Sequence, residues 1–151
     1  MKEEKEILSS IDDLIQTLKD GQEGYKQAAE GVKDSQLKSL FNEYSSQRAR
    51  FATELQSEAR NLGEWQPEES GSAAGAVHRA WINLKSAVTS GDDHAVLAEC
   101  ERGEDSAVEQ YNKALNEDLP GPLREMVSRQ YSEIKNAHDR IRNLRDTRKK
   151  G

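Results

Sequence analysis

The sequence predicts an all-α protein: an antiparallel bundle of four long helices with one extra short helix. Of its 151 residues, 33% are charged and 34% hydrophobic, while only 5% are aromatic. This composition is typical of long amphipathic helices, whereas sheets need runs of β-branched and aromatic residues. Apolar residues also recur three and four positions apart over most of the chain, which is the spacing of one helix face. The length favours a single domain over residues 1–151.

The first helix is predicted from about Lys5 to Val32. Its apolar residues alternate three and four positions apart, as in a bundle seam, at Leu8, Ile11, Ile15, Leu18, Tyr25, Ala29 and Val32. Gln22 interrupts this stripe with a polar side chain. Gly21 and Gly24 flank it and allow a neighbouring helix to approach closely. We therefore expect a polar layer on this helix.

A second helix follows the short turn at residues 33–35 and ends at Gly63. Its stripe has the same spacing, at Leu37, Phe41, Tyr44, Phe51, Leu55 and Leu62. So short a connection forces the two helices to lie antiparallel as a hairpin.

Residues 63–76 are rich in Gly, Ser, Pro and Glu, which predicts a long crossover back along the bundle. A short helix is expected at about 76–89, with one apolar face made of Val77, Trp81, Leu84 and Val88. Trp81 is expected to anchor this helix on the bundle, because large aromatic side chains mostly serve burial.

Two further long helices complete the second hairpin, from about His94 to Asn116 and from Leu123 to about Arg148. Pro122 suits the first turn of the last helix. The first stripe contains Leu97, Cys100, Ala107, Tyr111 and Ala114, with Glu104 on the same face. The second contains Leu123, Val127, Ile134, Ala137, Ile141 and Leu144, interrupted by Gln130.

The two hairpins share a weak internal repeat. A shift of 86 residues superimposes the apolar stripes and pairs Glu23 with Glu109, Tyr25 with Tyr111, Ala28 with Ala114 and Leu37 with Leu123. This pattern suggests pseudo-two-fold symmetry between the hairpins.

Polar residues on the stripes predict a polar layer near mid-bundle, consisting of Gln22, Gln47, Glu104 and Gln130. If each hairpin folds at its turn, Gln22 faces residues 45–47, and Glu104 faces Gln130 and Glu133. A buried acid must accept hydrogen bonds, stay protonated or meet a cation. We expect His138 to hydrogen-bond Glu104 or Glu101.

Four phrases carry a family resemblance: KDGQEGYKQAAE, SGSAAGAVHRAWINLK, LAECERGEDSAVEQY and NAHDRIRNLRD. In these phrases the chain resembles a bacterial family of ferritin-like four-helix-bundle proteins, which is classified as domain of unknown function 2383. The resemblance implies a ferritin-like fold and a bacterial cytoplasmic protein, but it implies no reaction.

Ferritin-like metal chemistry would need two helices that each supply Glu and two that each supply Glu-x-x-His. The histidines are His78, His94 and His138, and none has a Glu three positions before it. A lopsided site for one iron or manganese ion remains as an alternative, with ligands from Glu101, Glu104, Glu133 and His138.

The charge and cysteine content limit the partners. A net charge of -6 and a pI near 5.2 provide no positive field for nucleic acid or anionic membranes. No apolar stretch reaches the length of a membrane span, and the N-terminus lacks a signal-peptide core. The lone Cys100 is expected in the core of a cytoplasmic protein. Assembly into a homo-oligomer is compatible with the sequence.

Two function classes stay open. The sequence favours a non-catalytic bundle with a structural, interaction or stress-associated role, because no catalytic motif is present. The alternative is a degenerate ferritin-like protein that holds one iron or manganese ion through carboxylates and a histidine.

Overall fold

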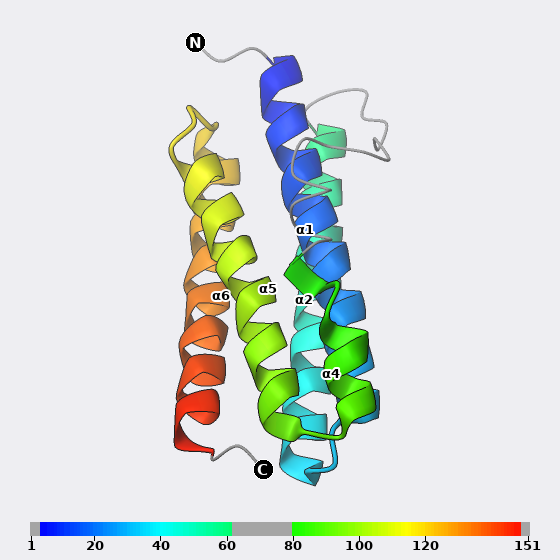
Figure 1. Cartoon of the computed structure of the whole chain (residues 1–151). Helices are drawn as coiled ribbons and strands as arrows, with labels where there is room; N and C mark the ends of the chain where they lie inside the picture. Colours follow the sequence, from blue (N-terminus) through cyan, green and yellow to red (C-terminus); the bar gives the residue numbers. More distant parts are fainter. Residues whose placement is uncertain (1–3, 62–79, 149–151) are drawn as a thin grey trace.

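The structure is a computed structural model that describes residues 4–61 and 80–148 (Figure 1). The described elements are α1 (Glu4–Gly31), α2 (Ser35–Asn61), α4 (Leu84–Ser90), α5 (Asp93–Leu115) and α6 (Gly121–Thr147). Within these two ranges there is no strand. The all-α prediction is confirmed, and the long helices begin and end close to the expected positions.

The four long helices form two antiparallel hairpins that pack side by side (Figure 1). Helix α1 contacts both α2 and α5, and α6 packs mainly on α5. Helices α2 and α5 run in the same direction and face each other diagonally across the bundle (Figure 1). The short α4 lies over α1 and α5, on the outside of the bundle.

Carboxylates fix the turns at one end of the bundle. Asp34 caps α2, because its Oδ1 accepts hydrogen bonds from the backbone N–H groups of Gln36 and Leu37 at 2.8 and 3.1 Å. Asp93 of α5 accepts the backbone N–H groups of Lys33 and Asp34 at 3.0 and 3.1 Å. The start of the second hairpin is thereby tied to the turn of the first.

The hydrophobic core divides into two clusters along the bundle axis. One contains Tyr25, Phe41, Leu97 and Ile141, and the other contains Ile11, Leu55, Tyr111 and Ile134, among further buried residues. On α2 the division falls between Tyr44 and Phe51, and on α5 between Cys100 and Ala107. Cys100 is buried in the core as expected. A mid-bundle layer that belongs to neither cluster therefore separates them.

The short helix is broken where the sequence predicts continuity. Ala80 and Trp81 are helical, Ile82 and Asn83 form a turn, and α4 begins only at Leu84. The prediction of one helix over residues 76–89 is wrong at this turn. Asn favours turns over helix interiors because its side chain competes for backbone hydrogen bonds. The predicted crossover at 63–76 and Val77 lie outside the described residues.

Trp81 is held between two glycines. A Cβ atom added to Gly24 of α1 or to Gly103 of α5 would overlap the Trp81 ring. The ring is 8% exposed, and its centroid lies 5.3 Å from that of Tyr25. Trp81 therefore anchors the segment before α4, as predicted. Its ring leaves room only for glycine at positions 24 and 103.

Within the described residues, none of the helices combines the length and the apolar character that crossing a membrane requires.

Candidate functional site

Glu104 is fully buried, and its charge is met by Arg48 of α2, which is 1% exposed. Arg48 donates from Nη1 to Oε1 at 2.6 Å and from Nη2 to Oε2 at 2.7 Å. This is the two-pronged geometry in which a planar guanidinium matches a carboxylate. The pair joins the diagonal helices α2 and α5 through the middle of the bundle. Glu104 thus points inward because it meets a buried cation from the opposite helix.

The surroundings of the pair keep Arg48 charged. Burial alone would lower the pKa of Arg48, but the charge and hydrogen bonds of Glu104 raise it above its ordinary value. The third donor of Arg48, Nε, binds Gln47 Oε1 at 3.1 Å. Its guanidinium carbon lies 5.4 Å from the ring centroid of Tyr25, within cation–π range. Each nitrogen of the Arg48 guanidinium therefore has a hydrogen-bond acceptor, and an aromatic ring lies near the group.

Tyr25 contributes a buried hydroxyl beside this pair. Within the part of the chain that the structure describes, this hydroxyl has no hydrogen-bond partner. Burial raises the pKa of Tyr25, and the nearby Glu104 carboxylate raises it further. Its hydroxyl therefore stays protonated and acts as a neutral neighbour of the ion pair.

Arg48 was not predicted as a polar-layer residue, although its position in the sequence indicates that role. The apolar stripe of α2 contains Tyr44 and Phe51, and Arg48 falls four positions after one and three before the other. It therefore occupies the same kind of stripe position that made Glu104 conspicuous on α5. A long charged residue on a stripe is commonly read as solvent-exposed, but here two such residues on facing helices are partners.

The other predicted polar-layer residues divide into buried and half-buried ones. Gln130 is fully buried: its Oε1 accepts the Tyr111 hydroxyl at 2.7 Å, and its Nε2 donates to Glu54 Oε1 at 2.9 Å. Gln22 and Gln47 are half-buried. The backbone oxygen of Gln22 accepts a hydrogen bond from Ser45 Oγ at 2.8 Å, so this pair of helices meets where the hairpin geometry predicts.

The mid-bundle residues do not fit a centre for two metal ions. Both oxygens of Glu104 are bound by Arg48, whose positive charge opposes a cation at the same place. Under the internal repeat, the positions equivalent to Glu104 and Arg48 hold Leu18 and Ile134, which are both buried. The equivalent positions on α1 and α6 therefore hold apolar side chains and supply no ligands.

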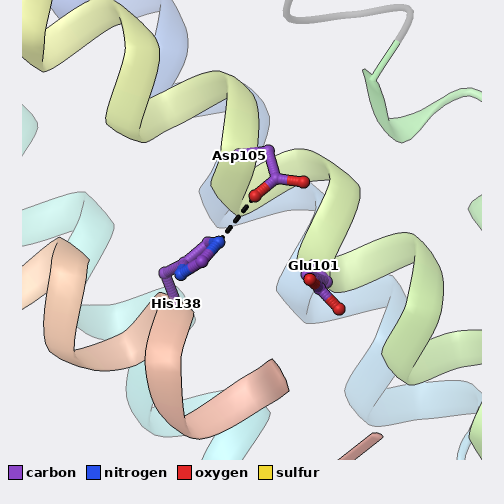
Figure 2. Close-up of side chains that lie close together, drawn as sticks. All are labelled: Glu101, Asp105 and His138. Carbon is purple, nitrogen blue, oxygen red and sulfur yellow. Dashed lines mark hydrogen bonds and ion pairs between the residues drawn. The ribbon is translucent and has the colours of Figure 1, made fainter. Parts of the chain in front are cut away.

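A second cluster lies between α5 and α6 and contains Glu101, Asp105 and His138 (Figure 2). One ligand atom from each residue lies within 4.8 Å of the others. His138 Nε2 is 2.6 Å from Asp105 Oδ1, and its Nδ1 is 3.0 Å from Asp139 Oδ1. His138 is 9% exposed and Asp105 60%, so the cluster opens to solvent on one side.

Arg145 of α6 also reaches this cluster. Its Nη1 lies 2.6 Å from Glu101 Oε1, and its Nη2 lies 2.8 Å from Asp146 Oδ1. The hydrogen bonds that Arg145 donates to Asp146 raise the pKa of Arg145 despite partial desolvation, and the charge of Glu101 adds to this. The hydrogen bond from His138 lowers the pKa of Asp139. The carboxylates of the cluster therefore face the imidazole ring of His138 and the guanidinium of Arg145.

The residues predicted as metal ligands fall in three places. Glu101 and His138 come together at the second cluster, Glu104 is in the interior with Arg48, and Glu133 is exposed on α6. The expected hydrogen bond of His138 to Glu104 or Glu101 is wrong, because its ring nitrogens contact Asp105 and Asp139. Asp105 was missed, although its spacing of four from Glu101 places both on one helix face.

The chain was compared with known proteins at the level of sequence. A family model described as Domain of unknown function (DUF2383) matches residues 6–117, a range that reaches from α1 to the end of α5. No curated protein matches the chain. The matched range contains Arg48 and Glu104, and it includes Glu101 and Asp105 but not His138. Because the match covers well over half of the sequence, the chain belongs to the DUF2383 family of unknown function.

Proposed function

We propose that this protein is a non-catalytic helical bundle of the bacterial cytoplasm that acts through its surface or its assembly, in a structural or stress-associated role. The observation that carries this proposal is the buried Arg48–Glu104 pair. A ferritin-like catalyst needs inward carboxylates that are free to hold metal. Here the inward carboxylate is fully engaged by a cation of the protein itself.

Metal entry at this layer would carry a large cost. A metal ion bound to Glu104 would have to displace Arg48, which is 1% exposed and would then lack its counter-charge. Leaving one member of a buried ion pair unpaired costs about 3–5 kcal/mol. The interior layer therefore serves the pairing of α2 with α5 and the register of the helices.

An iron-oxidation assay tests this proposal. Ferrous iron in aerobic buffer is expected to oxidise at the same rate with the wild-type protein, with the Glu104→Gln variant and without protein. The variant keeps a side-chain oxygen for Arg48 and removes the charge that a metal ion would need. Oxidation that the wild-type protein accelerates would contradict the proposal, and loss of that acceleration in the variant would assign it to Glu104.

The second cluster favours a second candidate function, the binding of one divalent cation by Glu101, Asp105 and His138. Two carboxylates and an imidazole suit Mn²⁺, Fe²⁺ or Zn²⁺. Asp139 contacts the far ring nitrogen of His138, which is the arrangement that orients histidine ligands in metal sites. This candidate keeps Glu101 and His138 of the ligand set predicted from the sequence, and replaces Glu104 and Glu133 by Asp105.

Titration with Mn²⁺, followed by electron paramagnetic resonance of the free ion, tests this candidate. The wild-type protein is expected to bind about one ion, because the cluster supplies one nitrogen and two carboxylate ligands to a single site. His138→Ala is expected to abolish that binding. His94→Ala is the matched control, since His94 lies on α5 outside the cluster. Equal binding by wild type and His138→Ala would remove His138 from the site.

A further inference from the structure

Arg145 contacts Glu101, one of the three residues of the second cluster. Its Nη1 lies 2.6 Å from Glu101 Oε1, the side chain of Glu101 is 12% exposed, and that of Arg145 is 33% exposed. The Oε1 atom is buried, and its contact with Arg145 lacks hydrogen-bond geometry. The contact is therefore mainly an attraction between charges, which a more concentrated positive charge can replace.

Asp146 offers the guanidinium of Arg145 a second partner. Arg145 donates to Asp146 Oδ1 from Nη2 at 2.8 Å and from Nε at 3.2 Å. Both of these donors are different from the nitrogen that faces Glu101. The guanidinium can therefore leave Glu101 and remain paired with a carboxylate.

The position of Arg145 in the helix makes this movement local. Arg145 lies in the last turn of α6, which ends at Thr147. The terminal turn of a helix frays more readily than its interior, because its last carbonyl groups have no partner within the helix. His138 lies two turns earlier on the same helix, so its position does not depend on that last turn.

We propose that Arg145 is a built-in competitor for the second cluster: it blocks Glu101 until a divalent cation displaces it toward Asp146. The inference rests on the single-cation site of the second candidate function. A metal ion and a guanidinium cannot share Glu101 Oε1 at ligand distance without strong repulsion. The apparent affinity for the metal is therefore lowered by the free energy that holds Arg145 on Glu101.

The test compares Mn²⁺ affinities of single variants by isothermal titration calorimetry. Arg145→Gln is expected to bind Mn²⁺ about three- to tenfold more tightly than wild type, since it removes the competing charge. Arg140→Gln is the matched control, because Arg140 is an exposed residue of the same helix and lies outside the cluster. Its affinity is expected to stay within about twofold of wild type.

Asp146→Asn separates direct competition from a general effect of charge. It is expected to weaken Mn²⁺ binding in the wild-type background, because Arg145 loses its alternative partner. It is expected to have no such effect in the Arg145→Gln background. Affinity of Arg145→Gln equal to that of wild type would overturn the competitor role and leave the site intact. Absence of binding in both proteins would remove the site and the competitor together.

Discussion

Glu104→Leu is expected to destabilise the protein by about 3–5 kcal/mol, the cost of leaving one member of a buried ion pair without its partner. Leucine is similar in size to glutamate, so the loss comes from the stranded charge of Arg48 and not from a cavity. Water has little access to Arg48 in the folded bundle, because its side chain is 1% exposed. Urea unfolding followed by far-UV circular dichroism measures the change.

Arg48→Met is expected to produce a comparable loss, because it strands Glu104 in the same layer. The matched control is Arg129→Met, which breaks the exposed ion pair with Glu54 at 3.1 Å. Exposed pairs contribute about 0–1 kcal/mol. Equal losses in Arg48→Met and Arg129→Met would contradict the special role of the buried pair.

Trp81→Ala is expected to destabilise the protein by about 3–5 kcal/mol, the usual cost of removing a buried tryptophan. Trp81 belongs to the core cluster around Tyr25 and fills the space between two helices. The same unfolding measurement applies. A change below about 1 kcal/mol would show that α4 and the residues before it pack without this anchor.

Gly103→Ala probes the same contact from the other side. In the wild-type background the added methyl group overlaps the Trp81 ring and is expected to cost about 1–3 kcal/mol. In the Trp81→Ala background the clash is gone, so the substitution is expected to be neutral or stabilising. Gly21→Ala is the control. The added Cβ would lie 3.6 Å from Arg48 Cγ, which is an ordinary van der Waals contact. This substitution is expected to stabilise α1 by about 0.5–1 kcal/mol, because alanine favours a helix more than glycine does.

The helices could be predicted from the sequence because their signals are local. Apolar spacing marks the four long helices, and a three-residue connection dictates the first hairpin. The turn at Ile82 and Asn83 was not predicted, since Trp81, Leu84 and Val88 keep the spacing of one helix face across it. Periodicity identifies the face of a helix but does not reveal a two-residue turn within it.

The partners of the polar residues were harder to predict, because side chains do not extend straight out from a helix. They tilt toward the N-terminus of their own helix. In the α5–α6 hairpin, Tyr111 therefore leans away from the turn while Gln130 leans toward it, and the two meet. Counting residues from the turn instead pairs Glu104 with Glu133, which is exposed in the structure.

The two charged partners show the limit of reading each helix separately. Glu104 was conspicuous as an acid on an apolar stripe, yet its partner lies on the diagonal helix α2 and not within its own hairpin. The packing of one hairpin on the other determines this contact, and no local pattern encodes that packing. Asp105 was not predicted for a different reason. It lies off the apolar stripe of its helix, where the sequence does not distinguish it from other surface acids, and its side chain is 60% exposed.

The measurement that tests the central claim most directly is a double-mutant cycle on Arg48 and Glu104. It compares the unfolding free energies of wild type, Arg48→Met, Glu104→Leu and the double variant. If the two charges neutralise each other, the double variant regains most of the loss of the single variants, because methionine and leucine pack without a stranded charge. Losses that simply add would contradict the account, since Glu104 would then depend on something other than Arg48.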